Sequence, residues 1–314
     1  MPILALGIDI GGTKIKLGLI DEEGRVVESH RQETNAKSGA AAVIASIAAG
    51  AREAFGADLR GAKMAGVAVA GQVDADGVVT GAPNLGWTGL PLRAELQRAL
   101  GIPCSVVNDV RAAAWAEWRF GAGRGSDDVV VLFIGTGIGG AIVSGGRMLE
   151  GYANSAGEIG HTTIIADGRQ CHCRNRGCLE AYVGGWAIGD RARIAAQQSP
   201  ERASLLIQLA GSVENISAST VDQANTKRDP LAAELVRDTG RFLGAGCVSF
   251  VNGFNPERLI LGGGVIDGLP ELVALAENVV RERALPSALG GLTIVPAGLA
   301  NDAPMIGAAT VARG

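Results

Sequence analysis

Aromatic side chains, histidine and clustered positive charge are all scarce in this chain. Aromatic residues make up 4% of the 314 residues, three residues are histidine, and the net charge is −4. Binding to nucleic acid requires a concentration of positive charge, and no long basic run is visible, so nucleic acid is not an expected partner. The two longest uncharged stretches, 129–146 and 284–301, are broken by glycine and predict no membrane-spanning helix.

The sequence also lacks the marks of an exported, disulfide-bonded protein. It has five cysteines, an odd number, and its apolar N-terminus carries no basic leader before it reaches Asp9. Disulfides form mainly in proteins that leave the reducing cytoplasm. We therefore expect a cytoplasmic protein with reduced cysteines, and the three cysteines between 171 and 178 need another explanation.

Apolar residues, by contrast, make up 47% of the chain, and their spacing indicates an α/β protein of two domains. Each half opens with a buried strand, a glycine-rich turn and a returning strand. The expected linker is 121–125. We predict a first domain at 1–120, onto which a C-terminal helix at about 302–314 packs, and a second domain at 121–301. Expected strands lie at 3–10, 15–20, 25–28, 64–70, 102–107, 129–134, 140–144, 258–261 and 292–295, and expected helices at 38–55, 91–100, 110–119, within 186–250 and at 304–312.

Three glycine-rich turns follow predicted strands and are candidates for holding phosphate groups. Glycine lets backbone N–H groups approach a phosphate closely. The first turn also offers the charge of Lys14 and the carboxylate of Asp9, which is suited to holding a hydrated Mg²⁺, although a plain hairpin turn with a surface lysine explains the same residues. Three such turns together predict a nucleotide held between two halves. The candidate residues are Asp9, Gly11, Gly12, Thr13 and Lys14; Gly135, Thr136 and Gly137; and Gly262, Gly263 and Gly264.

Asn108 and Asp109 close a predicted strand and precede a predicted helix. Both residue types favour the helix N-cap, and the helix dipole stabilises a carboxylate there, so capping alone accounts for the pair. The functional hypothesis is that Asp109 is the base that receives the proton of a sugar hydroxyl. Phosphoryl transfer requires mainly positioning and charge stabilisation, so an anionic aspartate suffices as the proton acceptor.

One imidazole and three thiols lie close together in the sequence, at His161, Cys171, Cys173 and Cys178. This set matches a closed tetrahedral zinc site, which leaves no open position and is therefore structural. His172 is an alternative ligand, although its place between two ligands favours a side chain that points away. The zinc is expected to fix a loop that carries Glu158 and Glu180. Their carboxylates can accept hydrogen bonds from sugar hydroxyls, and two solvated surface glutamates are the alternative.

The shared order of these motifs resembles the ROK family (repressor, open reading frame, kinase) of bacterial sugar kinases over nearly the whole chain. The cysteine block CHCRNRGCLE at 171–180 is the most specific segment. The other segments are DIGGTK at 9–14, PNLGW at 83–87, ND at 108–109, GTGIGG at 135–140, EIGH at 158–161 and NPERLILGGGV at 255–265.

The resemblance implies an actin-like ATPase (ribonuclease H-like) fold, with two domains around a cleft for ATP and sugar. It implies that Asp109 is the catalytic base, that the three glycine turns contact ATP, and that Mg²⁺ is the counter-ion. A structural Zn²⁺ and a homodimer are also implied, and His161 would serve both the zinc and the sugar, with one ring nitrogen each. The residues implied to line the sugar site are Asn84, Asn108, Asp109, Glu158, His161 and Glu180.

Glucose is the expected hexose, phosphorylated at its 6-hydroxyl, because PNLGW, EIGH and the cysteine block resemble glucokinases. N-acetylglucosamine and N-acetylmannosamine kinases share the cysteine block and stay open as alternatives. Two residues depart from the family pattern: Arg174 stands where the block has glycine, and Gln72 follows Gly71 where glucokinase-like members have a small turn. If the backbone at Arg174 needs a positive φ, the arginine costs roughly 1 kcal/mol or more. Gln72 bears on which sugar fits.

A sugar-responsive transcriptional repressor and a polyphosphate-dependent glucokinase are further alternatives. Repressors of the family carry a helix-turn-helix segment ahead of the kinase-like part, whereas here the first glycine turn begins near residue 9. The acidic charge balance and the presence of Asp109 also favour a kinase. The zinc block is not expected in a polyphosphate-dependent enzyme. We therefore expect an ATP-dependent hexose kinase of glycolysis.

Overall fold

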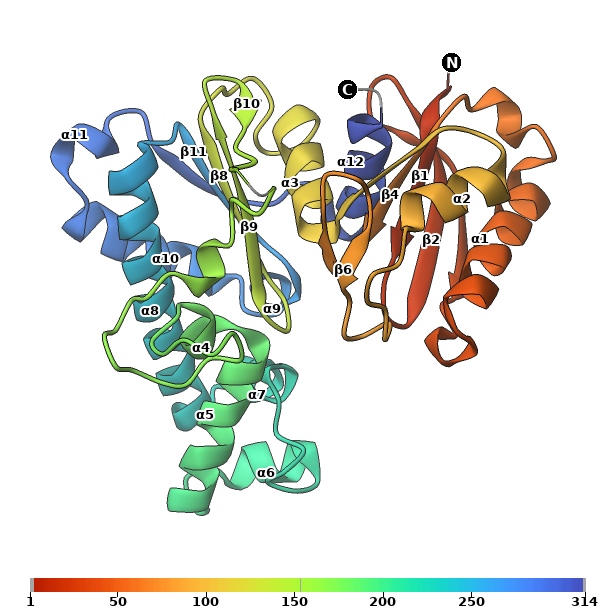
Figure 1. The fold of residues 1–314 in the computed structure, drawn as a ribbon. Coiled ribbons are helices and arrows are strands. Elements are labelled where there is room, and N and C mark those ends of the chain that lie inside the picture. The colour runs from red at the N-terminus through yellow and green to blue at the C-terminus, as the bar shows by residue number, and fades with distance from the viewer. Residues whose placement is uncertain (1–2, 153, 313–314) are drawn as a thin grey trace. The chain divides into compact units, whose positions relative to one another are not determined.

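The computed structural model describes residues 3–152 and 154–312, which form two compact units (Figure 1). The first unit comprises Met1–Gly125, Glu150–Ala156 and Gly298–Gly314, and the second comprises Ser126–Leu149 and Gly157–Ala297.

The units differ from the predicted domains at two places. The first boundary falls after Gly125, at the end of the glycine-rich segment and not at its start. Residues 150–156 and 298–301, expected in the second domain, group with the first unit because the chain returns to it twice. The expected C-terminal helix also belongs to the first unit, and residues 313–314 of that prediction lie outside the described residues.

A twisted sheet of five strands, counted over the described residues, forms the centre of the first unit, in the order β3-β2-β1-β4-β7. The first three strands form an antiparallel meander, as the short strands and the turn at 21–24 predict, and β4 and β7 continue the sheet in parallel with β1. The strands are β1 (Ile3–Ile10), β2 (Lys14–Asp21), β3 (Val26–Glu33), β4 (Ala65–Val69) and β7 (Cys104–Asn108). A small hairpin of β5 (Gln72–Val73) and β6 (Val79–Gly81) follows β4 and was not predicted.

The two faces of this sheet are covered in different ways. Large apolar residues such as Leu6 and Ile8 pack with α1 (Ala40–Phe55) and α2 (Leu92–Leu100) in one core. The opposite face carries α12 (Ala303–Val311) and α3 (Asp109–Arg119), which contact each other closely (Figure 1). Because successive strand residues point to opposite faces, residues of the β1 stretch 6–8 alternate between the two layers.

Glycine allows α12 to lie directly on the sheet backbone. A Cβ atom at Gly7 would stand 2.3 Å from the carbonyl oxygen of Met305, and one at Gly66 would stand 1.8 Å from that of Ala308. Such distances exclude any side chain at either position. The C-terminal helix is therefore held against strands from the beginning of the chain by close backbone packing.

The second unit contains another sheet of five strands within the described residues, in the order β10-β9-β8-β11-β12. β8 and the returning strand β9 pair antiparallel, as the strand, glycine turn and returning strand predict, and β11 and β12 run parallel to β8. Its strands are β8 (Val129–Ile134), β9 (Ile138–Ser144), β10 (Arg147–Met148), β11 (Arg258–Gly262) and β12 (Thr293–Pro296).

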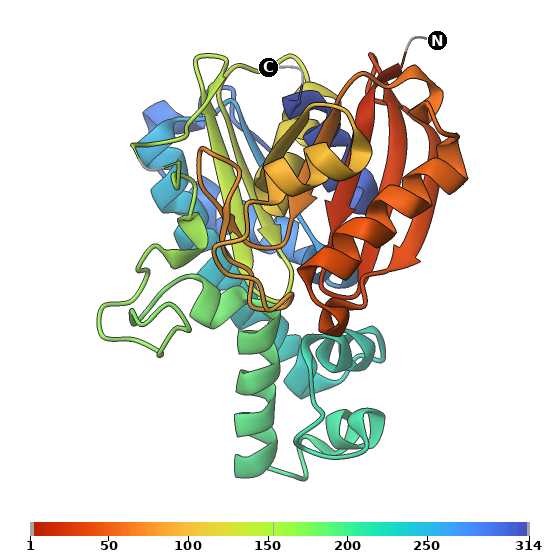
Figure 2. The ribbon, with the colours of Figure 1, turned by 45° about the vertical axis from the view of Figure 1, so that its right-hand side comes forward.

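Helices pack around this second sheet, and the long α8 contacts several of the others. Figure 2 shows α5, α6 and α7 grouped at one end of the unit. The helices are α4 (Glu180–Val183), α5 (Gly185–Gln198), α6 (Ser204–Ala210), α7 (Ala218–Thr226), α8 (Pro230–Phe254), α9 (Gly264–Gly268), α10 (Glu271–Arg283) and α11 (Pro286–Leu289). Over residues 3–152 and 154–312, no helix has the length and apolar character to cross a membrane.

The fully buried carboxylate of Glu117, on α3, joins two distant segments of the first unit. It accepts hydrogen bonds from the N–H of Ala122 at 2.9 Å, of Gly298 at 2.9 and 3.0 Å, and of Leu299 at 2.7 Å. A Cβ atom at Gly121 would lie 2.2 Å from the same carboxylate, so glycine is required there. Glu117 thus fixes the chain where it leaves the first unit toward Ser126 and where it returns after Ala297.

Replacing this carboxylate by an amide should destabilise the protein. In Glu117→Gln, one of the two acceptor oxygens becomes an NH₂ group that faces main-chain N–H donors. We expect a loss of about 2 kcal/mol in the free energy of unfolding, the usual size for lost hydrogen bonds to a buried charge, measured by urea unfolding. The control is Glu95→Gln, which removes only an exposed ion pair with Arg98 and should change stability by less than about 1 kcal/mol. Equal stability of the two variants would contradict the role of Glu117.

Candidate functional site

Three parallel strands of the first unit end at one edge of its sheet, and the predicted residues of this unit follow them. In the register of β1, β4 and β7, Ile10 pairs with Val69, and Val69 pairs with Asn108. Ligand sites of open α/β sheets lie at the carboxyl ends of the strands. The register therefore brings Asp9 and the turn at 11–14 to the same edge as Asp109.

The turn at 11–14 is closed by its own backbone. The N–H of Gly11 donates to the carbonyl of Lys14 at 3.0 Å, and the hydroxyl of Thr34 donates to the carbonyl of Gly11 at 2.7 Å. A Cβ atom at Gly12 would lie 3.1 Å from Cβ of Asn84, so glycine lets the turn approach the predicted sugar ligand. Thr13 and Lys14 are exposed at this edge.

Asn108 caps the following helix, and the side chain of Asp109 lies beside it. Asn108 is the N-cap of α3, where its Oδ1 accepts from the N–H of Arg111 at 3.0 Å, and its Nδ2 donates to the carbonyl of Gly71 at 3.0 Å. Oδ1 of Asp109 accepts from Asn108 Nδ2 at 3.0 Å and from the N–H of Val110 at 2.9 Å. Asn108 does the capping, and it also orients the neighbouring carboxylate.

Two carboxyl groups at this edge have raised pKa values. Burial raises the pKa of Asp109, and the hydrogen bonds from Val110 and Asn108 oppose that rise. Burial also raises the pKa of Asp9 to about 7, the negative charge of Asp109 adds to the rise, and Lys16 lowers it. A pair of carboxyl groups with an unfavourable mutual charge is a place where a cation is stabilising.

In the second unit, the turn at 135–137 is held by the start of α5 and by Glu180. The carbonyls of Gly135 and Thr136 accept from the N–H groups of Gly185 at 2.9 Å and Trp186 at 3.1 Å. Oε2 of the buried Glu180 accepts from the N–H of Ile138 at 2.8 Å. The predicted sugar ligand Glu180 and the predicted phosphate turn are therefore neighbours.

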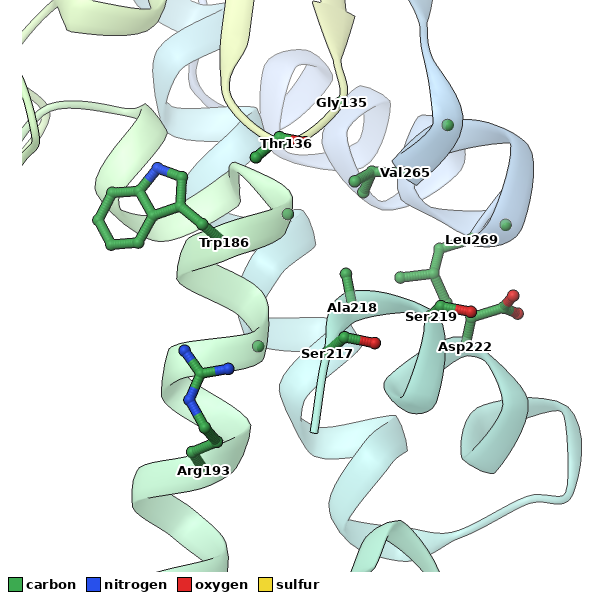
Figure 3. A pocket seen from close by; sticks show the side chains of 14 residues that line it. Gly135, Thr136, Trp186, Arg193, Ser217, Ala218, Ser219, Asp222, Val265 and Leu269 are labelled. Carbon is green, nitrogen blue, oxygen red and sulfur yellow. The ribbon is translucent and has the colours of Figure 1, made fainter. Parts of the chain in front are cut away.

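Beside this turn lies a cavity of about 470 Å³, shown in Figure 3. The predicted residues Gly135, Thr136 and Gly264 line it, at the ends of β8 and β11. Gly263 has φ +92°, and a Cβ atom there would stand 2.6 Å from the carbonyl oxygen of Ile134, so the backbone requires glycine. Two of the three predicted glycine turns thus meet at one cavity.

Arg193, Ser217 and Asp222 also line the cavity, and none of the sequence motifs includes them. Arg193 lies on α5 and Asp222 on α7, while Ser217 is the N-cap of α7 (Figure 3). The helical pattern in the sequence predicts these helices but not which residue of each reaches the turn. The two helices that complete the cavity lie between the motifs at 171–180 and 255–265.

The four predicted metal ligands come together in the second unit. One ligand atom from each of His161, Cys171, Cys173 and Cys178 lies within 4.8 Å of the others. The sulfur atoms of Cys173 and Cys178 are 3.6 Å apart, and Nδ1 of His161 is 3.7 Å from the sulfur of Cys171. Zinc–sulfur bonds of about 2.3 Å in a tetrahedron require sulfur atoms roughly 3.8 Å apart, so the group fits zinc. Nε2 of His161 is the ring nitrogen left for a second role.

The loop between these ligands carries His172 and Arg174, and the structure shows the side chain of the first and the backbone of the second. His172 stacks on Trp186, with ring centroids 4.1 Å apart and an interplanar angle of 21°, and lies outside the ligand group. Arg174 has φ +76°, in the left-handed region where the family pattern has glycine. The backbone at Arg174 therefore has the positive φ at which an arginine is expected to be strained.

The predicted site residues fall into two groups, one in each unit. The first unit holds Asp9, the turn at 11–14, Asn84, Asn108 and Asp109. The second holds the turns at 135–137 and 262–264, Glu180, the metal group and Glu158, which is exposed just before the 3₁₀ helix Ile159–His161. Gln72 is exposed on β5, next to the Gly71 carbonyl that binds Asn108.

The raised pKa of Asp9 predicts how stability changes with pH. Between about pH 4 and pH 7, the folded protein keeps a proton that the unfolded chain has released, so raising the pH favours unfolding. In a chelating buffer, Asp9→Asn should gain stability over the wild type as the pH rises from 4 to 8. We expect a relative gain of at least about 1.4 kcal/mol, which is the equivalent of one pKa unit, in urea unfolding. A pH-independent difference would contradict the raised pKa.

Arg174→Gly should stabilise the metal loop. Glycine removes the steric cost of the left-handed backbone, which we expect to add about 1 kcal/mol to the free energy of unfolding. The metal content measured by elemental analysis should stay the same, because no ligand changes. As a control, Arg176→Gly alters a neighbouring arginine whose φ is not among the positive ones and should not stabilise the protein. A loss of stability in Arg174→Gly would show that the arginine side chain has a compensating contact.

Comparison with known proteins places these features in a family. The sequence profile described as "ROK family" matches residues 5–314. A glucokinase of Streptomyces coelicolor is 35% identical over 99% of this chain and 98% of its own length. A ROK family glucokinase from Streptomyces griseus, solved with glucose and AMPPNP, is 35% identical with a TM-score of 0.81, covering 98% of this chain and 99% of its own.

The family also contains regulators. A solved ROK family transcriptional regulator, a homologue of the Escherichia coli Mlc protein, is 30% identical with a TM-score of 0.82, and the match covers 98% of this chain and 77% of the regulator. The resemblance read from the motifs and the expected actin-like α/β fold class are confirmed. The chain belongs to the ROK family.

Proposed function

We propose that this protein is a hexose kinase that transfers the γ-phosphoryl group of ATP to the 6-hydroxyl of glucose. The similarity to glucokinases over 99% of the chain supports the reaction class. The observation that carries the proposal is the Asp109 carboxylate, which Asn108 and the N–H of Val110 orient at the carboxyl edge of three parallel strands. A fixed carboxylate at such an edge is placed to accept a proton.

ATP is the proposed phosphoryl donor. The turns at 135–137 and 262–264 meet at the 470 Å³ cavity, whose size suits part of a nucleotide. We assign the base and ribose to this cavity, where Asp222 can accept hydrogen bonds from ribose hydroxyls. The turn at 11–14, with Lys14, is assigned to the phosphates.

Asp9 is the proposed contact of the Mg²⁺ that accompanies ATP. Its carboxylate oxygen is the type of ligand that Mg²⁺ uses, and burial and the negative charge of Asp109 raise its pKa, so a cation there would favour its ionised form. When bound with the nucleotide, the ion would neutralise charge on the phosphates. The exposed lysine of the same turn, Lys14, supplies a second positive charge.

We assign sugar binding to residues of both groups: Asn84, Asn108 and Asp109 in the first unit, and Glu158, His161 and Glu180 in the second. Asp109 takes the proton of the 6-hydroxyl as that oxygen bonds to the γ-phosphorus and the bond to the bridging oxygen of ADP breaks. Carboxylates such as Glu180 accept hydrogen bonds from the other hydroxyls. The raised pKa of Asp109 makes it a stronger base once it is ionised.

A structural Zn²⁺ is the proposed occupant of the His161 and cysteine group, where it would hold the loop that ends at Glu180. Zinc supplies folding free energy when it binds such a closed set of ligands. We further propose that the protein acts in glycolysis in the cytoplasm and forms a homodimer, as the family resemblance implies.

Other kinase substrates and the regulatory function of some relatives are the competing proposals. N-acetylglucosamine and N-acetylmannosamine kinases are the alternatives on which Gln72 bears, because it follows Gly71, whose carbonyl accepts from the proposed sugar ligand Asn108. A regulator that binds sugar without chemistry would need no base, whereas Asp109 is present and oriented. Kinetics with a panel of sugars separates these proposals.

The test measures ATP-dependent phosphorylation of glucose, mannose, fructose, glucosamine and the two N-acetyl sugars. We expect the highest kcat/KM for glucose. In Asp109→Asn, kcat should fall at least about 100-fold, because general base catalysis contributes that much, while calorimetry should show retained glucose binding. Normal turnover in this variant would reject Asp109 as the base. Activity on an N-acetyl sugar alone would correct the substrate, and binding without turnover in the wild type would favour the regulator.

A further inference from the structure

Trp186, the second residue of α5, links three parts of the second unit. Its N–H group in the main chain donates to the carbonyl of Thr136 in the glycine turn. Its indole Nε1 donates to Oε1 of Glu180 at 3.2 Å, and its ring stacks on His172 at 4.1 Å. In Figure 3, the indole leaves α5 on the side away from Asp222. No motif of the sequence includes this residue.

Trp186 completes the orientation of the Glu180 carboxylate. Glu180 is 8% exposed, and its other oxygen, Oε2, accepts from the N–H of Ile138 at 2.8 Å. The indole N–H on Oε1 and the main-chain N–H on Oε2 fix the plane of the carboxylate. The thiol of Cys171 is a weaker third donor, at 3.9 Å from Oε1, but a metal-bound thiolate there would have no proton to donate and would repel the carboxylate. With a metal bound, the indole N–H would be the attractive contact that holds Oε1 in place.

The ring of Trp186 is also in contact with the metal loop itself. His172 stands between the ligands Cys171 and Cys173, and its side chain stacks on the indole and stays outside the ligand group. A bound metal fixes the backbone on both sides of His172. The position of the imidazole, and with it the stack on Trp186, therefore depends on the metal loop being closed.

We propose that Trp186 is a positioning residue whose indole N–H holds the Glu180 carboxylate in place for the sugar. Because the indole also stacks on His172, the position of Glu180 depends on the closed metal loop. The part that concerns the sugar rests on the proposed function. The part that concerns the loop rests only on the contacts of Trp186.

The first experiment measures glucose binding by calorimetry, without nucleotide, in the intact protein. Trp186→Phe keeps a ring that can stack on His172 but removes the N–H donor to a carboxylate. We expect at least about 10-fold weaker binding, the factor that corresponds to 1.4 kcal/mol for a hydrogen bond to a charged group. The matched control is Trp115→Phe on α3, because the indole nitrogen of Trp115 is buried without a partner in the described part of the chain. The control should bind glucose like the wild type.

The second experiment follows tryptophan fluorescence while EDTA removes the metal, with elemental analysis as the check of removal. We expect a change of emission in the wild type and in Trp115→Phe, and no such change in Trp186→Phe. His172→Ala, which retains all four ligands, should bind metal but lose most of the fluorescence response. If Trp186 only filled space in the core, the fluorescence change on metal removal would not depend on His172.

Either of two results would overturn the proposal. One is glucose affinity in Trp186→Phe equal to that of Trp115→Phe, which would remove the positioning role. The other is a fluorescence response that persists in Trp186→Phe, which would remove the link to the metal loop. If the wild type itself binds no glucose, the sugar part is rejected together with the proposed function, and the fluorescence experiment still decides whether Trp186 senses the loop.

Discussion

A buried carboxylate must find hydrogen-bond donors, and this constraint organises both units. Glu117 satisfies it with the N–H groups of Ala122, Gly298 and Leu299, so the outgoing and returning segments of the first unit are fixed to one helix. Glu180 satisfies it with Ile138 and Trp186 in the second unit. Burying a charge costs several kcal/mol unless such donors are present, so each carboxylate dictates the arrangement of segments that are distant in sequence.

Glycine imposes a second constraint, with two separate causes. At Gly12 and Gly263 it permits the turns that we assign to phosphates, where a Cβ atom would meet Asn84 and the carbonyl of Ile134, respectively. At Gly7 and Gly66 it permits α12 to lie on the backbone of the sheet, which no phosphate explains. The abundance of glycine in this chain is therefore as much a matter of packing as of ligand binding. Sequence alone could not separate the two, because the partners of Gly7 and Gly66 come from the C-terminal helix.

The sequence predicts best what is encoded locally. Most strands and helices follow from apolar periodicity, and the ligands at 161–178 follow from their spacing, because each pattern is contained in a short segment. Arg193, Ser217 and Asp222 were not predicted, since only the packing of α5 and α7 brings them to the cavity. The return of residues 150–156 to the first unit was also missed, because those residues carry no pattern and are grouped there by tertiary contacts alone.

The two carboxyl groups at the edge of the first sheet differ in what acts on them. Burial and the negative charge of Asp109 raise the pKa of Asp9 to about 7. Hydrogen bonds from Asn108 and Val110 favour the ionised form of Asp109 against the effect of burial. Burial thus raises the pKa of both carboxyl groups, but the hydrogen bonds that oppose this rise act on Asp109, whereas at Asp9 the opposing influence is the charge of Lys16.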